Sequence, residues 1–447
     1  MTAEPEPLNL HLGWLYEEPK ILDKSQPLHI DFENLEKHSV ILAQSGGGKS
    51  SLVGRIVEEI LIKTSGRVVV IDTNADFRKS HLVTQEGPDD KKVWTDDARP
   101  LTGSFDRNEF VKRWEDRAKL YLTNSVVREA NRSDPAESKQ PDWIVPYVSW
   151  NELPRPWQLE VLGLELSRHP NEVAAFYRVA RRLGDEEQSQ VLVSPSTVGD
   201  ELKLLAATST VTNRLDERVA VSLQVRCQQA AELDLWRTDD SQSDLARCLE
   251  GKSQLVVLDI PAVSKGSKRV QDEPKRGMIL FGYLLDALWN LARKQWDEAV
   301  STNAKDQRRP TFLVVDEAHN FVPDKDPTEP LALRVSSVIQ RIAAEGRKYG
   351  LYLLLVTQRP QKIRQGLLWE CENLCLLRLQ SPTDLEFAQG IWGFELPPSV
   401  TKIAKFPPGR GMLFGPWSNG EPKYFQAGLR RTKETGGNLN KNWILNG

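Results

Sequence analysis

Cysteine is scarce in this chain of 447 residues. Its four cysteines form no CxxC pair and have no histidines at metal-ligand spacing beside them: Cys227, Cys248, Cys371 and Cys375. The pattern argues against a disulfide framework and against a zinc site. We therefore expect buried thiols in a reducing compartment.

Long apolar runs are also missing. The longest one, from Met278 to Ala292, is interrupted by Asp286 and falls short of the roughly 20 residues that a membrane-spanning helix needs. Residues 1–30 carry charges throughout and contain no apolar signal core. These absences predict a cytoplasmic chain without a membrane partner.

Positive charge is not in excess. The chain has 59 lysines and arginines against 62 aspartates and glutamates, which gives a formal net charge of −3. Coating of nucleic acid by a polycationic surface is thereby excluded, although a local basic loop is not. Hydrophobic residues make up 39% of the chain, which is enough for a sizeable core and argues against global disorder.

What the chain does contain is an alternation of strand and helix patterns from residue 39 onwards, typical of an α/β fold with a mostly parallel sheet. Strands are predicted at 40–43, 67–72, 254–260, 312–316, 351–357 and 374–379, and helices at 50–63, 108–121, 278–296 and 331–349. Residues 157–248 have helical periodicity. Two short alternating runs, at 8–12 and 28–32, predict edge strands of a short N-terminal β segment.

A glycine cluster follows the first of these buried strands and precedes an amphipathic helix. Gly48, Lys49 and Ser50 meet the P-loop pattern G-x-x-x-x-G-K-[ST], while Ala43 takes the place of its first glycine. That change is acceptable if the turn needs no positive φ at Ala43. Backbone N–H groups of such a turn bind phosphate oxygens, assisted by the positive end of the helix. The predicted ATP-binding residues here are Gln44, Ser45, Gly46, Gly47, Gly48, Lys49, Ser50 and Ser51.

The chemistry of a P-loop requires further groups. Lys49 would reach the β- and γ-phosphates, and the Ser50 hydroxyl would bind Mg²⁺ together with Asp316, which ends the strand at 312–316. Glu317 would orient and deprotonate the attacking water. Gln358, which closes the strand at 351–357, has the type and place of a sensor that positions this water.

The sequence disagrees with the patterns of two classes of P-loop protein. The ABC-transporter signature LSGGQ is absent, and only about 130 residues follow Glu317, whereas superfamily 2 helicases carry a second RecA-like domain after this motif.

The chain resembles the HerA-type hexameric ATPases of the HerA/FtsK superfamily. The matching segments follow the family's order along the chain and lie at 37–50, 71–77, 312–322, 345–350, 357–360, 373–379 and 430–437. The resemblance implies an α/β fold with a RecA-like P-loop NTPase core and a helical insertion, assembled as a homo-hexamer around double-stranded DNA, with ATP and Mg²⁺ at subunit interfaces. The corresponding division is 1–38 for the β segment, 39–125 and 251–431 for the core, 126–250 for the insertion and 432–447 for the tail.

The resemblance also implies roles for residues outside the P-loop. Arg347 would be the arginine finger that reaches the γ-phosphate of the neighbouring subunit, with Arg378 as the second candidate for a phosphate-facing arginine. Lys37 stands where the family has an arginine near the nucleotide, and Arg430 and Arg431 match a C-terminal segment that folds back toward it.

An acidic pattern of the family, D-x-H-G-E, is altered in this chain. Asp72 and Asp76 match its acidic positions, and Asp72 is predicted near the nucleotide. Asn74 and Ala75 replace the family's histidine and glycine, which leaves the roles of the two aspartates open.

DNA would be held by loops that face the channel of the ring. The first candidate loop contains Lys265, Lys268 and Arg269, which could contact phosphates without reading bases. A second basic cluster consists of Arg359, Lys362 and Arg364. The family begins with a β-barrel that docks a nuclease, whereas 42 residues precede Ala43 here, so that docking of the usual nuclease stays open.

Taken together, these features predict an ATP-hydrolysing ring motor that translocates double-stranded DNA, working with a nuclease or other effector in DNA end processing or anti-phage defence. The alternative is an ATP-gated assembly scaffold that activates a partner effector without moving along DNA. A monomeric small-molecule kinase is disfavoured by Glu317 and by the interface arginine Arg347.

Overall fold

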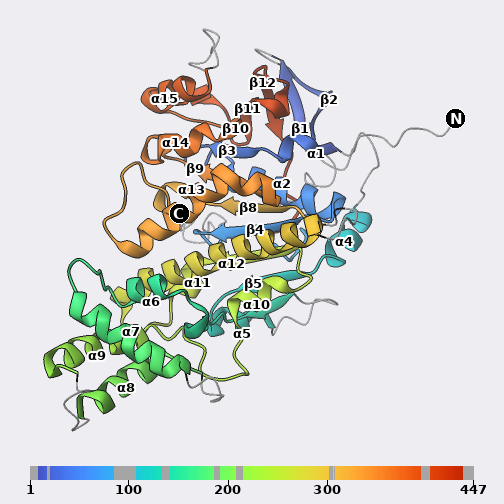
Figure 1. Ribbon diagram of the computed structural model, residues 1–447. Coiled ribbons are helices and arrows are strands. Elements are labelled where there is room, and N and C mark those ends of the chain that lie inside the picture. Colours follow the sequence, from blue (N-terminus) through green and yellow to red (C-terminus); the bar gives the residue numbers. More distant parts are fainter. Residues whose placement is uncertain are drawn as a thin grey trace, which may run out of the picture.

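The computed structural model describes residues 9–17, 21–84, 107–132, 141–185, 192–207, 215–301, 306, 308–393 and 403–435. Its framework is a single sheet of twelve strands in the order β2-β1-β12-β11-β10-β3-β9-β8-β4-β7-β5-β6 (Figure 1). Helices cover both faces of this sheet. The predicted α/β fold with a mostly parallel sheet is thereby confirmed.

Eight neighbouring strands run parallel to one another: β10 (Cys371–Leu376), β3 (His38–Leu42), β9 (Leu351–Thr357), β8 (Thr311–Val315), β4 (Arg67–Asp72), β7 (Leu255–Asp259), β5 (Lys119–Leu122) and β6 (Asp142–Ile144). The central strands are rich in Val, Ile and Leu and buried on both faces, as parallel strands between helices must be. Their carboxyl ends share one edge of the sheet, and this edge carries the site described below.

Four antiparallel strands extend the sheet beyond β10: β1 (Asn9–Glu17), β2 (Ile21–Asp31), β11 (Arg410–Phe414) and β12 (Lys423–Ala427). The expected N-terminal strands therefore exist, and β2 forms the outer edge of this sheet. The backbones of β1 and β12 approach closely at Gly13, where an added Cβ would lie 2.1 Å from the carbonyl oxygen of Gln426.

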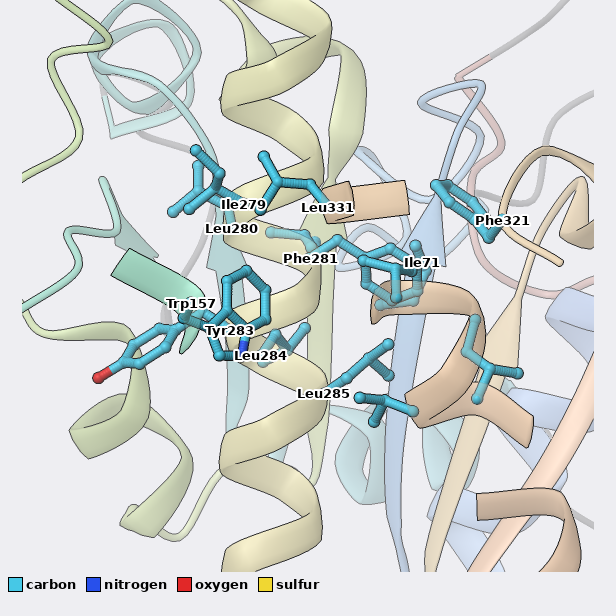
Figure 2. Close-up of a cluster of buried hydrophobic side chains, with 14 of the residues drawn as sticks. Ile71, Trp157, Ile279, Leu280, Phe281, Tyr283, Leu284, Leu285, Phe321 and Leu331 are labelled. Atoms are coloured by element: carbon cyan, nitrogen blue, oxygen red, sulfur yellow. The ribbon is translucent and has the colours of Figure 1, made fainter. Parts of the chain in front are cut away.

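The two faces of the sheet are covered by different helices. On one face lie α2 (Lys49–Lys63) and α4 (Arg107–Glu115), and on the other lie α12 (Glu273–Ser301) and α13 (Pro330–Glu345). Figure 2 shows Phe281 and Leu285 of α12 beside Ile71 of β4, and the rings of Phe281 and Phe321 meet edge to face at 4.6 Å. Each fully buried side chain of this kind contributes about 1.5–3 kcal/mol to stability.

The segment expected to be a helical insertion contains α5 (Ser125–Arg132), α6 (Arg155–Val161), α7 (Pro170–Asp185), α8 (Pro195–Ala207), α9 (Glu217–Ala231) and α10 (Leu245–Glu250). It also contains β6, which belongs to the main sheet. The helix predicted at 108–121 is shorter in the structure, where α4 ends at Glu115. Residues Lys119–Leu122 instead form strand β5, which pairs with β7. A four-residue strand is defined by its sheet partner rather than by its own pattern, which is why the sequence missed it.

Shorter helices complete the fold: α1 (Phe32–Leu35), α11 (Ile260–Ser264), α14 (Gln365–Trp369) and α15 (Pro382–Trp392). The helix predicted at 331–349 consists of α13 followed by a 3₁₀ turn over Gly346–Tyr349, and it ends at Gly350, which has a left-handed conformation. Within the described ranges, no helix has the length and hydropathy of a bilayer span. Most of the expected tail at 432–447 lies outside the described residues.

Candidate nucleotide-binding site

The glycine cluster forms a turn between β3 and α2, at the carboxyl edge of the sheet. Gly46 and Gly48 have φ values of 70° and 94°, which favour glycine, and Lys49 is the first residue of α2. An added Cβ at Gly48 would also lie 2.4 Å from the backbone nitrogen of Gly409, so no larger side chain fits there. Ala43 is not among the described residues with positive φ, as the sequence required.

Lys49 lies between the two carboxylates that end β8. Its Nζ is 2.9 Å from Asp316 Oδ1 and also pairs with Glu317 Oε1. Burial lowers the pKa of the Lys49 ammonium, but Asp316 and Glu317 more than offset this effect, so the net shift is upward. The predicted cation and the two predicted carboxylates are therefore brought together in one partly buried cluster.

Asp316 is fixed by two further donors. Its Oδ2 accepts hydrogen bonds from Thr73 Oγ1 and Asn74 Nδ2, each at 2.8 Å. Asn74, which replaces the histidine of the family pattern, thus orients the carboxylate of Asp316. Ser50 Oγ donates a hydrogen bond to Asp76, the second acidic residue of that pattern.

Oxygen atoms of this kind suit Mg²⁺, which in nucleotide sites is held by one or two carboxylates together with phosphate oxygens and water. Among the described residues no group of three or more His, Cys, Asp or Glu side chains forms a metal cage. The predicted ligands are the hydroxyl of Ser50 and the carboxylate of Asp316, and the carboxylate of Asp76, which accepts from Ser50, is a further oxygen that fits. They would hold the ion, whose charge would offset that of the phosphates.

Glu317 has a strained backbone, with φ 45° and ψ 48°. A non-glycine residue in this left-handed region costs on the order of 1–3 kcal/mol, and such strain is concentrated at functional sites. One oxygen of this carboxylate pairs with Lys49. Its other oxygen lies 3.4 Å from His319 Nδ1, and the same ring nitrogen lies 3.0 Å from Thr357 Oγ1 at the end of β9.

Gln358 follows Thr357 directly at the carboxyl end of β9. Because β9 lies between β3 and β8 in the sheet, Gln358 stands between the glycine turn and Asp316 at the same edge. This is the place that the sequence assigned to the sensor.

Asp72 ends β4 and is fully buried. It accepts hydrogen bonds from the backbone N–H groups of Asp76 and Phe77, which closes the turn that carries Asn74 and Asp76. Burial raises the pKa of Asp72 to about 7, assisted by the nearby carboxylates of Asp259 and Asp316 and opposed by the bond from Phe77. Asp72 thus shapes this turn, in which Ala75 has φ 62° where the family has glycine.

Arg378 lies beside the glycine turn of its own chain. Its Nη2 donates a hydrogen bond to the Gly46 carbonyl at 2.9 Å, while its Nε is buried and has no partner in the described part of the chain. In addition, the N–H of Gln44 donates to the Arg378 carbonyl. This arginine can therefore approach phosphates bound in its own turn.

Lys37 and Arg347 lie at the opposite edge, next to the amino ends of β3 and β9. Both pair with Glu372, Arg347 through Oε1 and Lys37 at 3.4 Å from Oε2. A strand of this length separates them from the glycine turn by about 17 Å. Lys37 therefore lies about one strand length from the glycine turn of its own chain, and its contact with a nucleotide stays a prediction.

The C-terminal segment does fold back toward the site, but its two arginines differ. Arg430 packs over the ring of Phe77 and donates to the Asp76 carbonyl, and its buried Nη2 has no partner within the residues that the structure describes. Arg431 instead pairs with Glu59 at 2.9 Å. Glu59 lies about 15 Å along α2 from Lys49, so this ion pair holds Arg431 away from the glycine turn, and its predicted contact with the nucleotide stays a prediction.

The first candidate DNA loop follows α11, at the same edge of the sheet as the glycine turn. Lys265, Lys268 and Arg269 are exposed, although Arg269 pairs with Glu232 at 2.7 Å. In the second cluster Arg359 and Lys362 are exposed, while Arg364 pairs with Asp326.

Several residues of the site were missed by the sequence: Thr73, His319 and Glu372. Thr73 and His319 lie within the family segments quoted above, so their positions carried a signal. Glu372 carried none, because its importance comes from Lys37 and Arg347, which are far away in the sequence.

Comparison with known proteins gives a consistent result. Residues 10–125 match the family described as the central domain of helicase HerA. The DNA double-strand break repair helicase HerA of Pyrococcus furiosus is 23% identical over 389 residues, covering 79% of this chain and 58% of that protein. The protein of the same name from Sulfurisphaera tokodaii is 32% identical over 370 residues, covering 82% and 60%. The chain thus spans less than two thirds of the length of these relatives.

Among solved structures, the bacterial conjugative coupling protein TrwBdeltaN70, in its trigonal form with sulphate, has a TM-score of 0.51 at 12% identity. The match covers 94% of this chain and 92% of that one. The similarity shows that the two share a P-loop NTPase fold.

Proposed function

We propose, from the relationship of this chain to the HerA helicases over most of its length, that it hydrolyses ATP and uses the energy to move along double-stranded DNA as a ring of six subunits. Its phosphate-binding turn, its carboxylates and its sensor would act within one subunit. The neighbouring subunit would add cationic charge.

The observation that carries the proposal is the position of Lys49 between Asp316 and Glu317. The γ-phosphate of ATP would take the place of these carboxylates as the partner of Lys49. Glu317 would then be free to accept a proton from the water that attacks the γ-phosphorus, as a general base does. The fixed charges of Lys49 and Arg378 would stabilise the negative charge on the phosphoryl oxygens in the transition state.

The edge position of Lys37 and Arg347 supports a shared site. Neither residue can reach the glycine turn of its own chain, yet together they present two partly exposed cations. A second copy that packs this edge against the carboxyl edge would place both cations near its nucleotide. The number of six subunits rests on the resemblance to the HerA-type ATPases.

The partners belong to the same proposal. The curated relatives are named DNA double-strand break repair helicases, which supports DNA as the substrate. A nuclease or another effector, in DNA end processing or in defence against phage, and a cytoplasmic location complete the proposal. These parts rest on the sequence resemblance.

Purified protein tests the motor. We expect ATP hydrolysis that duplex DNA stimulates, and ATP-dependent displacement of the third strand from a DNA triplex. Hydrolysis that is indifferent to DNA, together with activation of an added effector, would instead support the assembly scaffold. A monomer by light scattering in the presence of ATP and Mg²⁺ would contradict the shared site.

A further inference from the structure

A second polar pocket lies at the carboxyl edge of the sheet, away from the glycine turn. It has a volume of about 480 Å³ and is bordered by the segments that follow β5, β6 and β7 and by the start of α12. In parallel α/β sheets, ligands bind at the carboxyl ends of the strands. The residues that define its chemistry are Arg128, Trp143, Lys265 and Arg276.

Arg276 gives the pocket a buried positive charge. Its side chain is 4% exposed and donates hydrogen bonds to the backbone carbonyl oxygens of Leu233, Val263, Lys265 and Asp234. In the described part of the chain no carboxylate forms an ion pair with it. The carboxylates of Asp234 and Glu273 act on this cation only through space, so Arg276 adds positive charge to the pocket without a bonded carboxylate among the described residues.

Two further donors, both buried, lack an acceptor among the described residues, and a third group is an exposed cation. Trp143 is 3% exposed, and its indole Nε1 has no hydrogen-bond partner among the described residues. The Nε of Arg128 is likewise buried without a partner, and the ammonium of Lys265 is exposed and forms no ion pair within the described ranges. Buried N–H groups are usually bonded, so the donors of two residues that line one pocket are available to an acceptor bound there.

The charges favour an anion. Arg128, Lys265 and Arg276 line the pocket together with one carboxylate, that of Asp234, so the described lining has an excess of positive charge. Ser125 at the start of α5 also lines it, and the first backbone N–H groups of a helix add to a positive field.

We propose that this pocket binds a phosphate group of a nucleic acid backbone. Lys265 belongs both to the pocket and to the basic loop that also presents the exposed Lys268, so a strand bound along the loop would bring its phosphates to the pocket. The inference rests on the proposed function, since it assumes that the protein acts on DNA. It places a contact with a DNA phosphate in a pocket whose lining residues lie outside the short segments that carry the resemblance to the HerA-type family.

The test is the salt dependence of binding of a short fluorescein-labelled DNA duplex to the full chain with a non-hydrolysable ATP analogue, measured by fluorescence anisotropy. Arg128→Ala and Lys265→Ala should each weaken binding about three- to tenfold and reduce the salt slope by about one, because each removes one phosphate contact. Trp143→Phe keeps the ring and removes the neutral donor. It should weaken binding with an unchanged salt slope.

Arg168→Ala is the matched control, since this arginine is exposed and pairs with Glu165 outside the pocket. It should bind DNA like the wild type. Circular dichroism checks the fold of each variant, and Lys265→Ala, at an exposed site, keeps the test valid if a buried variant does not fold.

Three outcomes overturn the proposal. If the variants bind DNA with the affinity and the salt dependence of the wild type, the pocket does not contact DNA. The proposed motor function would not be affected by this result. If inorganic phosphate raises the thermal stability of the wild type but not of Arg128→Ala, and DNA binding is unchanged, the pocket takes a free phosphate. A wild type that binds no DNA would end both the pocket proposal and the proposed DNA motor.

Discussion

Arg347 pairs with Glu372 at the amino edge of the sheet, opposite the edge that carries Lys49. The side chain of Arg347 is 44% exposed, and Lys37 shares the same carboxylate. Glu372 therefore holds two cations away from the glycine turn of its own chain. Such a position suits the proposed finger for a neighbouring subunit, because both cations lie about one strand length from the glycine turn of their own chain.

Arg347→Ala should keep nucleotide binding and lose turnover, by about a thousandfold or more if it acts as an arginine finger. Binding is measured with a fluorescent ATP analogue and turnover by phosphate release. Subunits with Arg347→Ala mixed with subunits with Glu317→Gln should regain part of the activity, since some interfaces then combine an intact finger with an intact base.

Lys348→Ala is the control for this variant. Lys348 is the next residue along the chain, and its ammonium lies 4.2 Å from the centre of the Trp296 ring rather than on Glu372. It should hydrolyse ATP normally. If the mixed assemblies stay inactive, Arg347 is not the finger. Another residue, with Arg378 as the second candidate, would then have that role.

Glu317→Gln and Lys49→Ala should separate turnover from binding. Glu317→Gln removes the proposed base and should lower turnover by about a hundredfold or more, with nucleotide binding retained. Lys49→Ala removes the cation that would contact the phosphates and should weaken binding itself. The exposed Glu370→Gln is the control, and normal turnover by Glu317→Gln would remove Glu317 as the base.

The sequence predicted the P-loop side of the site because local patterns define it. A buried strand, a glycine turn and an amphipathic helix follow one another within residues 39–63, and the structure has β3, the turn and α2 there. The Asp-Glu pair after β8 was found in the same way. In each case the residues that act together are neighbours in the sequence or end adjacent parallel strands.

The remaining features depend on contacts between distant segments. Lys37 and Arg431 were assigned to the nucleotide by family position, but Glu372 and Glu59 determine where their side chains lie. Strands β5 and β6 were missed because each has few residues and is held by its neighbour in the sheet. Such pairings cannot be read from one segment alone.

A buried network of charges anchors α2 to the C-terminal segment and should contribute strongly to stability. Glu59 is 1% exposed and pairs with Arg55, Lys63 and Arg431 at 3.3, 2.6 and 2.9 Å. Glu59→Gln would leave these cations without their carboxylate and should lower the free energy of unfolding by about 3–5 kcal/mol.

Thermal and urea unfolding check this prediction. Glu165→Gln is the control, because the ion pair of Glu165 with Arg168 is exposed and should contribute less than about 1 kcal/mol. If both variants unfold alike, the network contributes no more than a surface pair.

The pH dependence of stability should reveal the buried carboxyl of Asp72. Its pKa rises from 3.8 to about 7 on folding, mainly because of burial. Below about pH 4 the group is protonated in both states. Between about pH 4 and 7 the unfolded chain loses this proton and the folded chain retains it, so the free energy of unfolding falls as pH rises.

Asp72→Asn keeps an oxygen that can accept from the N–H groups of Asp76 and Phe77, but it cannot ionise. The thermal midpoint of the variant relative to that of the wild type should therefore increase from pH 5 to pH 8, measured without nucleotide or Mg²⁺. Asp297→Asn, at an exposed site on α12, controls for the loss of one carboxylate. A constant difference for Asp72→Asn across this range would mean that Asp72 is already ionised at pH 5, held by its backbone donors despite its burial.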